Sequence, residues 1–240
     1  CIIRFMAKST SSRKANTGKP GSTAQARIIR EGALNQARRS LILDAARAAF
    51  SELGLDGASL REIAKRAGYT PGAIYSYFAN LEEIYGALLG ESLQRLNQVV
   101  HDAKANTRAK TRTAETTELL RAKVEAFYTF YRDNPKELDL GFYLFNGAKP
   151  RGLTPELNRA LNEQLLASLQ PVRDLLVTSG LNTDEATVET NAVFAHIVGT
   201  LVLTNTGRIR LFQQSPDALF ERYMNSLIQR LPVSHGQNFT

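Results

Sequence analysis

Apolar residues recur every three or four positions from Arg38 to the end of the chain, and no window alternates between apolar and polar residues as an amphipathic strand would. This period is that of helices that bury one face. It predicts helices over about 37–53, 60–67, 71–78 and 81–103, a helix that carries apolar residues over 120–131 and ends at Asn134, and three later helices that begin near Pro155, Thr183 and Pro216. We therefore expect an all-α fold.

The second and third predicted helices are short and have clear start and stop signals. Ser59 and Glu62 have the spacing of a capping box, in which the Ser59 hydroxyl accepts a hydrogen bond from the backbone of the third helical residue. Gly68 suits a left-handed helix end, and Thr70 followed by Pro71 suits the start of the next helix. Two short helices joined by such a turn are typical of a helix-turn-helix, although a helical hairpin of this kind also packs in ordinary bundles.

The expected outer face of the third helix favours contact with DNA. It carries small or hydroxyl-bearing residues and no acid: Thr70, Ala73, Tyr75, Ser76 and Tyr77. Such a face can approach a phosphate backbone closely and can donate hydrogen bonds to phosphates and base edges. The pattern therefore indicates a helix that enters the major groove.

Positive charge is concentrated at the N-terminus. Residues 1–40 contain nine Lys or Arg against one acid, a net charge of +8, whereas the other 200 residues carry 21 basic and 22 acidic residues. Flexible basic arms neutralise phosphates, so this asymmetry is typical of proteins that bind nucleic acid or an anionic surface; a solubilising tail is the alternative interpretation. Because the segment is rich in Ser, Thr, Gly and Ala and begins without an apolar period, we expect a disordered basic arm over 1–36.

Composition argues against several other classes of protein. The chain has 240 residues, one cysteine and three histidines, which form neither a disulfide framework nor a recognisable zinc site, and no nucleophile-base-acid set or Gly-rich phosphate loop occurs. We expect no metal, no cofactor and no catalytic residue. The longest uncharged run, 190–207, is interrupted by polar residues, and the N-terminus lacks a secretory signal, so we expect no membrane span, no membrane partner and a cytoplasmic location.

The segment from Ser59 to Ile84, SLREIAKRAGYTPGAIYSYFANLEEI, resembles the DNA-binding motif of the tetracycline-repressor (TetR) family of bacterial transcription regulators. The match includes the Gly-aromatic-Thr turn and the Ile-Tyr-x-Tyr-Phe end of the recognition helix, and it extends back through the first helix to Ile42. The resemblance implies a helix-turn-helix DNA-binding domain over 37–80, a helical ligand-binding and dimerisation domain over 81–232, and a C-terminal tail over 233–240.

The resemblance also implies which residues contact a double-stranded DNA operator. They comprise two arginines at the start of the first predicted helix and the helix caps and outward residues of the two short helices: Arg38, Arg39, Ser59, Arg61, Thr70, Pro71, Ala73, Tyr75 and Tyr77. One position departs from the family pattern, because Leu81 stands where many members have a phosphate-binding Lys. We expect the basic arm to compensate for that contact.

Aromatic residues are dense between the fifth predicted helix and residue 145. Core packing explains such residues in most proteins, but several on adjoining helices can also line an apolar cavity. The resemblance implies an effector pocket in this region, and the candidates are Phe127, Phe130, Tyr131, Phe142, Tyr143, Phe145 and, on a later helix, His196. The unidentified small-molecule effector is then expected to be partly apolar or aromatic.

The helix that begins near Thr183 is apolar nearly all round, so it must be covered on most sides. The resemblance implies that the last two helices form a homodimer interface, and small residues would permit close approach of the partner. The candidates are Ala192, Ala195, Gly199, Tyr223 and Leu227; the alternative is the ordinary core of a monomer.

Together these features predict a sequence-specific DNA-binding transcriptional regulator, a homodimeric repressor that a small molecule releases from a pseudo-palindromic operator. The alternatives are a nonspecific DNA-associated protein that acts through its basic arm and, with less support, an all-helical enzyme that uses the aromatic region. The motifs identify neither effector nor operator, and activation in place of repression stays open. With Met6 close behind Cys1, it also stays open whether residues 1–5 belong to the native chain.

Overall fold

The computed structural model describes residues 22–105, 111–142, 145–146, 149–150 and 153–232. Within these ranges the helices are α1 (Ser22–Gly57), α2 (Leu60–Ala67), α3 (Pro71–Ile74), α4 (Leu81–Asp102), α5 (Arg112–Asp133), α6 (Pro135–Phe142), α7 (Pro155–Thr178), α8 (Thr183–Asn205), the 3-10 helix η1 (Arg208–Phe212) and α9 (Pro216–Arg230). The strands β1 (Phe145–Asn146) and β2 (Lys149–Pro150) form a short antiparallel pair. The all-α fold expected from the apolar spacing is confirmed; the two-residue strands are an addition that the pattern did not indicate.

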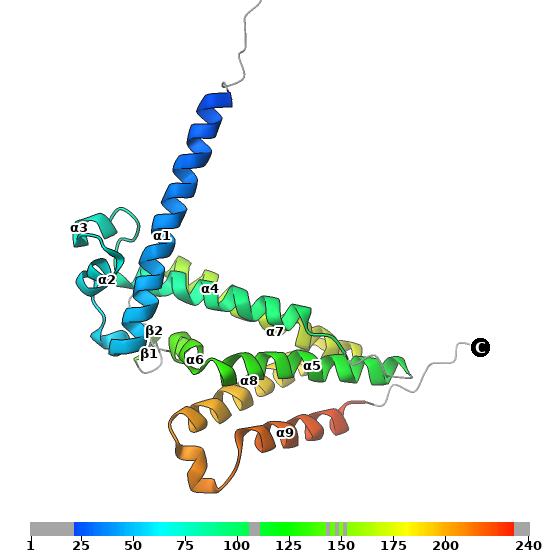
Figure 1. Cartoon of the computed structure of the whole chain (residues 1–240). Helices are drawn as coiled ribbons and strands as arrows, with labels where there is room; N and C mark the ends of the chain where they lie inside the picture. The colour runs from blue at the N-terminus through cyan, green and yellow to red at the C-terminus, as the bar shows by residue number, and fades with distance from the viewer. Residues whose placement is uncertain (1–21, 106–110, 143–144, 147–148, 151–152, 233–240) are drawn as a thin grey trace, which may run out of the picture.

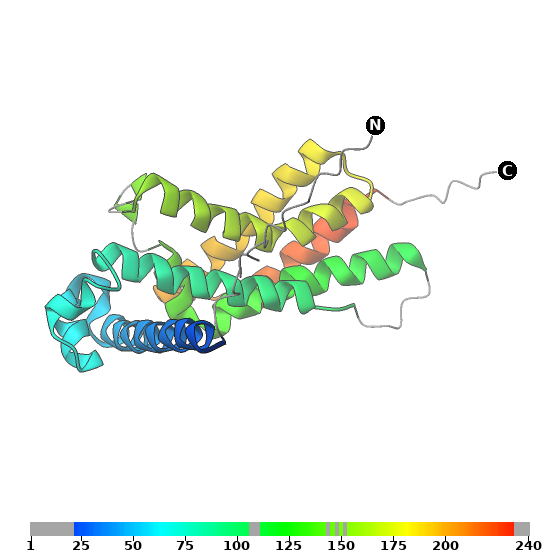
Figure 2. The ribbon, with the colours of Figure 1, turned by 90° about the horizontal axis from the view of Figure 1, so that it is seen from above.

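Two hydrophobic cores divide the chain into an N-terminal unit and a C-terminal unit that share α4. Figures 1 and 2 show α4 running from the short helices α2 and α3 into the helices of the C-terminal unit. The core of the N-terminal unit joins α1, α2, α3 and the start of α4 through Ile42, Ile63, Ile74 and Ile84. The core of the C-terminal unit joins the rest of α4 to α5, α7, α8 and α9. Because α4 passes from one core into the other, a movement of this helix displaces both units.

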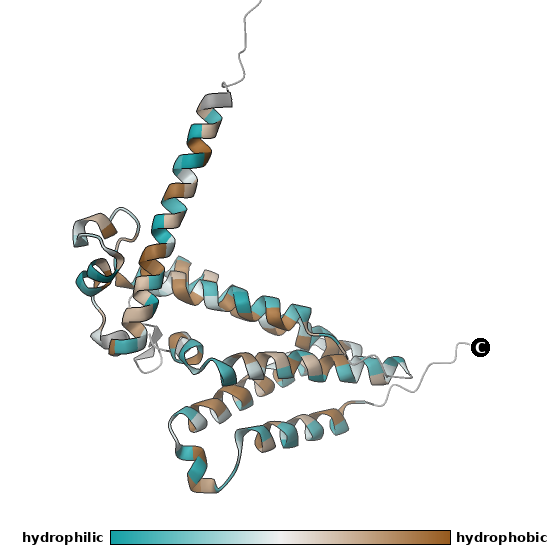
Figure 3. Ribbon diagram, in the orientation of Figure 1, coloured by the Kyte–Doolittle hydropathy of each residue, from teal (hydrophilic) through white to brown (hydrophobic). Residues whose placement is uncertain are grey.

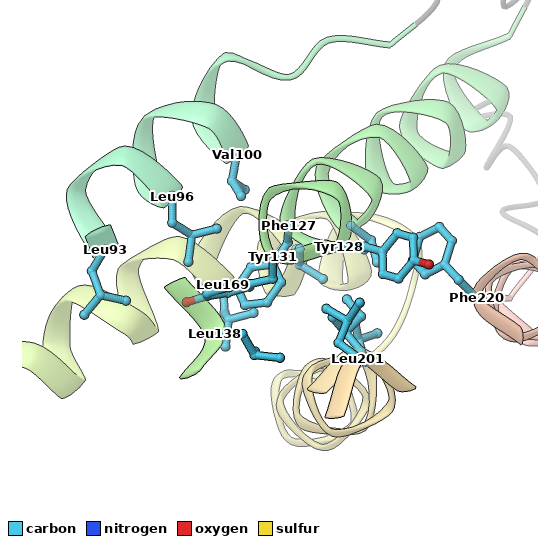
Figure 4. Close-up of a cluster of buried hydrophobic side chains, with 14 of the residues drawn as sticks. Leu93, Leu96, Val100, Phe127, Tyr128, Tyr131, Leu138, Leu169, Leu201 and Phe220 are labelled. Carbon is cyan, nitrogen blue, oxygen red and sulfur yellow. The ribbon is translucent and has the colours of Figure 1, made fainter. Parts of the chain in front are cut away.

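Aromatic residues of α5 fill the centre of the C-terminal unit, as Figure 4 shows for Phe127, Tyr128 and Tyr131. The Tyr128 ring stacks on Phe220 of α9 with 4.2 Å between ring centroids, and its hydroxyl donates to Asp217 at 2.7 Å. Burial and the neighbouring carboxylate both raise the pKa of Tyr128, so the phenol stays protonated and donates. α5 is thus joined to α9 by an apolar and a polar contact.

A glycine permits close packing of α4 on α7. A Cβ atom added at Gly86 would lie 2.6 Å from Cδ2 of Leu157, well inside van der Waals contact. Only glycine fits there without displacing the leucine side chain. Gly86 lies between Ile84 and Leu88, two α4 residues of the N-terminal core, so the packing of α7 bears directly on the segment of α4 that supports that unit.

α1 begins 15 residues earlier than the apolar spacing predicts, which corrects part of the prediction of a disordered arm over 1–36. Residues 22–36 are helical, and every described side chain from Ala24 to Arg38 is exposed. Ala, Arg, Gln and Leu are strong helix formers, and Arg27 pairs with Glu31 one turn away at 2.8 Å, so the helix extends without an apolar partner. Figure 1 shows this part of α1 projecting from the body; residues 1–21 lie outside the described residues.

Several other helix ends agree with the sequence pattern, and two differ. The regular helix of α1 breaks at Gly54, which has a φ of 70°, in agreement with the predicted end of this helix near residue 53. α3 ends at Ile74 in place of 78, because the chain then forms a turn in which the Tyr77 amide donates to the Ile74 carbonyl at 2.8 Å. α8, which the pattern places near Thr183, is capped by Asn182, since Asn182 and Glu185 form a complete capping box.

α8 carries apolar residues on most of its surface, as Figure 3 shows. By length and composition it is the one helix of the described chain that could cross a membrane, although the sequence pattern indicated that this run was too polar to do so. About a third of its apolar window, 33%, is buried inside the chain. The same composition also suits a helix that is covered by another chain.

Candidate nucleic-acid interface

The turn between α2 and α3 is built as the sequence pattern predicted. The Ser59 hydroxyl accepts from the Glu62 amide at 3.2 Å and caps α2, and Gly68 ends that helix with a φ of 72°. The Thr70 hydroxyl accepts from the Ala73 amide at 3.3 Å and caps α3. Because Gly68 adopts the left-handed conformation that other residues rarely tolerate, the turn holds the two short helices in a defined orientation.

The segment 70–77, named here the recognition segment, presents polar side chains outward. Thr70, Pro71 and Ser76 are exposed, and Tyr75 is 59% exposed. Tyr77 is half-buried and packs its ring 6.5 Å from that of Tyr69. The outer face therefore consists of Tyr75, hydroxyl groups and backbone, as a surface that contacts phosphates and bases requires.

The charges around the recognition segment leave α2 with a positive outer surface. Arg61 is exposed and forms no hydrogen bond or ion pair with any described residue. Arg66 pairs with Glu62 at 2.7 Å and with Glu52 at 2.9 Å, and these carboxylates raise the pKa of Arg66. Glu52 and Glu62 are thus paired with Arg66, and Arg61 together with exposed Lys65 is available to an anionic partner.

The guanidinium of Arg39, which is predicted to contact DNA, is engaged within the N-terminal unit, and its contact with DNA stays a prediction. It donates to the Tyr77 carbonyl at 3.2 Å and lies 4.1 Å from the centre of the Phe78 ring. Arg38, the neighbouring candidate, is exposed and has no partner among the described residues. Sequence reasoning missed the contact of Arg39 because it joins residues 38 positions apart.

A polar groove of about 430 Å³ separates α1 from the end of the recognition segment. It is lined by Asn35, Gln36 and Arg39 of α1 and by Ser76 and Tyr77. The groove offers side-chain donors next to the predicted DNA-binding surface, which is the chemistry that a phosphate group requires. No sequence signal indicated it, since the α1 side of the groove lies largely in the arm that was expected to be disordered.

Leu81, which stands where many family members have a Lys, packs against the core of the N-terminal unit. It is the first residue of α4, and Asn80 caps this helix by accepting from the Glu83 amide at 2.8 Å. The start of α4 therefore lacks a cationic side chain and carries Glu82 and Glu83 in its first turn. Cations that hold phosphates must come from other elements.

The predicted effector residues fall into three groups. Phe127, Phe130 and Tyr131 lie together on α5 with edge-on ring contacts of 5.3 and 5.1 Å, and Phe194 of α8, which sequence reasoning missed, adds a contact to Phe127 at 6.0 Å. These four residues are named here the aromatic cluster. Tyr143 lies outside the described residues, and so do the side chains of Phe142 and Phe145.

His196 points to α9 and stacks on Tyr223, with 4.2 Å between ring centroids. Burial lowers the pKa of His196, outweighing a backbone hydrogen bond at Leu219 that raises it. The Tyr223 hydroxyl donates to Glu189 at 3.0 Å, and burial raises the pKa of this tyrosine. Among the described ring contacts, His196 therefore belongs to the contact between α8 and α9 and not to the aromatic cluster.

An exposed apolar stripe runs along α8 with helical spacing and comprises Val188, Ala192, Ala195, Gly199 and Val202. Val188 is 68% exposed and Val202 is 42% exposed. Three of the five predicted dimerisation residues lie in this stripe, whereas Tyr223 is half-buried on α9. Leu227 is in the core of the C-terminal unit, because the packing of α9 on α8 turns it inward, so it cannot contact another chain directly.

Comparison with known proteins adds sequence and fold relatives. Residues 42–88 match the family of bacterial regulatory proteins named tetR, and residues 120–227 match the tetracyclin repressor-like C-terminal domain. The HTH-type transcriptional repressor AcnR of Corynebacterium diphtheriae is 38% identical over 63 residues, which are 26% of this chain and 33% of that protein. The match thus spans about a third of the length of this curated relative.

Solved structures share the fold at low sequence identity. A protein of unknown function from Rhodococcus sp. has a TM-score of 0.60 at 19% identity, and the aligned part covers 81% of this chain and 95% of the Rhodococcus chain. The fatty acid degradation regulator FadR from Bacillus halodurans has a TM-score of 0.56 at 21% identity, and the aligned part covers 81% of this chain and 97% of the FadR chain. The TetR family transcriptional regulator PfmR from Thermus thermophilus has a TM-score of 0.55 at 18% identity, and the aligned part covers 81% of this chain and 96% of the PfmR chain.

Proposed function

Because the chain belongs to the tetR family of bacterial regulatory proteins, we propose that it is a homodimeric, cytoplasmic transcriptional repressor. It binds a pseudo-palindromic operator with two recognition segments and leaves the DNA when a small molecule binds to the C-terminal unit. The observation that carries this proposal is the outer face of the N-terminal unit, where Tyr75 and Arg61 are exposed and the acids Glu52 and Glu62 are paired with Arg66. Nothing in this proposal requires a cofactor or catalysis.

The residues proposed to contact DNA are not equivalent. Ser59 and Thr70 act through the backbone amides that they cap, which places α2 and α3 at the phosphate backbone. Tyr75 and Arg61 reach outward to phosphates or bases, whereas Tyr77 contributes its carbonyl to Arg39 and supports the segment from behind. Pro71 and Ala73 have short side chains and permit close approach to base edges.

The stripe on α8 supports the dimer. Its apolar residues are exposed in a single chain, and burial of a side chain such as Val188 contributes about 1–2 kcal/mol. The small residues Ala192, Ala195 and Gly199 let a second α8 approach closely. Contact between the α8 helices of two copies would cover these apolar residues, so the apolar composition of α8 does not require a membrane.

The effector is proposed to be partly apolar or aromatic, because the aromatic cluster lies in the core of the C-terminal unit. A ligand that binds better to the form that does not bind DNA shifts the population away from the operator complex. Since α4 joins the two cores, a displacement of α4 changes the distance between the two recognition segments of a dimer.

Selection of bound sites from random DNA at physiological salt tests the DNA-binding part. We expect enrichment of one inverted repeat, and the Tyr75→Ala variant should bind it about 10- to 100-fold more weakly while remaining dimeric. Tyr75→Phe is the matched control, which retains the ring and isolates the hydroxyl. Absence of an enriched repeat with folded, dimeric protein would refute sequence-specific regulation and leave the nonspecific alternative.

The dimer is tested by Val202→Arg, which brings a charge into the proposed interface. Sedimentation should show dimerisation about 100-fold weaker, because burying an unpaired charge costs several kcal/mol. Leu166→Arg is the control, since Leu166 is an exposed apolar residue of α7 outside the stripe. Equal dimerisation of both variants would place the interface elsewhere.

A further inference from the structure

A second cavity lies where the N-terminal unit meets the C-terminal unit. It is a groove of about 720 Å³ between α1, α4 and the junction of α5 with α6. Its apolar lining includes Phe50 of α1, Leu88 of α4, and Pro135 and Leu140 of α6. The described residues that line it include none of the four residues of the aromatic cluster, so the groove is distinct from that cluster.

Three polar contacts connect the helices around the groove in pairs. The Lys136 ammonium of α6 donates to the Ser51 hydroxyl of α1. Arg95 of α4 pairs with Glu137 of α6 at 2.5 Å, and Arg47 of α1 pairs with Glu91 of α4 at 2.7 Å. An occupant of the groove therefore touches elements of both units and lies beside the contacts that set their relative orientation.

The charges of the lining indicate which ligand fits. The groove is lined by three cations and three carboxylates, and each cation already has a partner: Arg47 and Arg95 pair with carboxylates, and Lys136 with Ser51. A charged ligand would find no net complementary charge here, whereas an uncharged ligand leaves the pairs intact. The Ser51 hydroxyl and the Asn134 amide are hydrogen-bonding groups in the same lining. The volume lies in the range of small-molecule sites.

We propose that this groove binds an uncharged, largely apolar small molecule with one or two hydrogen-bonding groups, and that its occupancy changes the orientation of the N-terminal unit. The second half of this statement rests on the proposed function, because orientation matters only for a protein that binds DNA. The first half does not depend on DNA.

Binding is tested with N-phenyl-1-naphthylamine, an uncharged aromatic amine whose fluorescence rises in apolar sites. Ser51→Trp fills the groove from an exposed position of α1. Ser51→Ala removes the hydrogen bond to Lys136 but leaves the groove open. Ser40→Trp is the matched control, because it adds the same side chain to an exposed position of α1 outside the lining. The chain contains no tryptophan, so each indole is the sole reporter. Its emission shows whether residue 51 is sheltered and residue 40 is in water.

We expect the probe to bind the wild type, Ser51→Ala and Ser40→Trp with affinities within about twofold, and to bind Ser51→Trp at least about 10-fold more weakly. Equal binding to all four proteins, or to none, overturns the site. In the second arm the probe should weaken operator binding by the wild type but not by Ser51→Trp. If the protein binds an operator and the bound probe does not weaken that binding, the proposed effect of the groove on DNA binding is overturned. If no operator is found, the proposed function is refuted, and the probe-binding result alone decides whether the groove is a binding site.

Discussion

Replacing Arg39 by Ala tests whether this residue supports the recognition segment or contacts DNA. Its guanidinium donates to the Tyr77 carbonyl at 3.2 Å and lies 4.1 Å from the centre of the Phe78 ring. A hydrogen bond from a charged donor contributes about 1.5–3 kcal/mol and an exposed cation-π contact about 0.5–1 kcal/mol. Because Arg39 is only half-buried, the lower ends apply and the loss is about 2 kcal/mol. For a chain of this size that corresponds to a Tm lower by about 4–8 °C.

Thermal unfolding followed by circular dichroism measures that loss, and operator binding over a range of salt concentrations measures the role of the charge. If Arg39 acts as a support, Arg39→Ala lowers Tm and affinity but leaves the slope of log K against log salt unchanged. Loss of a phosphate contact would instead reduce the slope by about 0.9. Arg39→Lys should recover part of the Tm loss, because the ammonium can lie over Phe78 but lacks the planar, forked donor geometry of arginine.

Arg38→Ala is the control for the same helix. Arg38 is exposed and has no partner among the described residues, so its removal should leave Tm unchanged and, if it meets a phosphate, lower the salt slope. The supporting role is refuted if Arg39→Ala keeps the wild-type Tm and lowers the salt slope as a phosphate ligand would.

Three further predictions concern the C-terminal unit. Tyr128→Phe removes the hydroxyl that donates to Asp217 at 2.7 Å but keeps the ring, so urea unfolding should show a loss of about 1 kcal/mol. Asn182→Ala removes the side-chain oxygen that accepts from the Glu185 amide at 2.9 Å and should cost about 1 kcal/mol, whereas Thr183→Ala, at the position where the sequence pattern places the start of the helix, should cost much less. Burial lowers the pKa of His196 in the folded chain below its ordinary value of 6.5. The imidazole is therefore protonated more readily in the unfolded chain, so the free energy of unfolding should be highest above pH 6.5 and should decrease as the pH falls below that value. In His196→Phe, which keeps the ring contact with Tyr223, that part of the pH dependence should disappear from a series of Tm measurements.

The ends of the helices could be predicted where a local signal encodes them. Ser59, Thr70 and Ser215 are caps whose hydroxyls accept from the amide three residues on, and this bond depends only on nearby residues. The early start of α1 at Ser22 could not be predicted from apolar spacing, because that pattern reports which face is buried and this part of the helix buries none. Helix propensity was the signal that could have found it.

The site could be predicted in part, and the limits follow from packing. The exposure of Tyr75 and the cap of Thr70 follow from the short motif, so these candidates lie where a DNA-binding role needs them. α8 is apolar nearly all round, and the pattern alone could not show that Phe194 faces the aromatic cluster while His196 faces α9. Leu227 was assigned to the wrong surface for the same reason, since its orientation depends on a neighbouring helix.

The connection between the two units combines one strong and several weak contacts, and this combination suits regulation by a small molecule. α4 places Ile84 in the N-terminal core and Leu96 in the C-terminal core, so the units cannot separate without exposing buried side chains. The pair of Arg95 with Glu137 is partly exposed, and such a pair contributes about 1 kcal/mol or less. A ligand needs a differential affinity of only about 1–3 kcal/mol to shift an allosteric equilibrium. The orientation of the N-terminal unit can therefore be changed by one bound molecule while its attachment through α4 is retained.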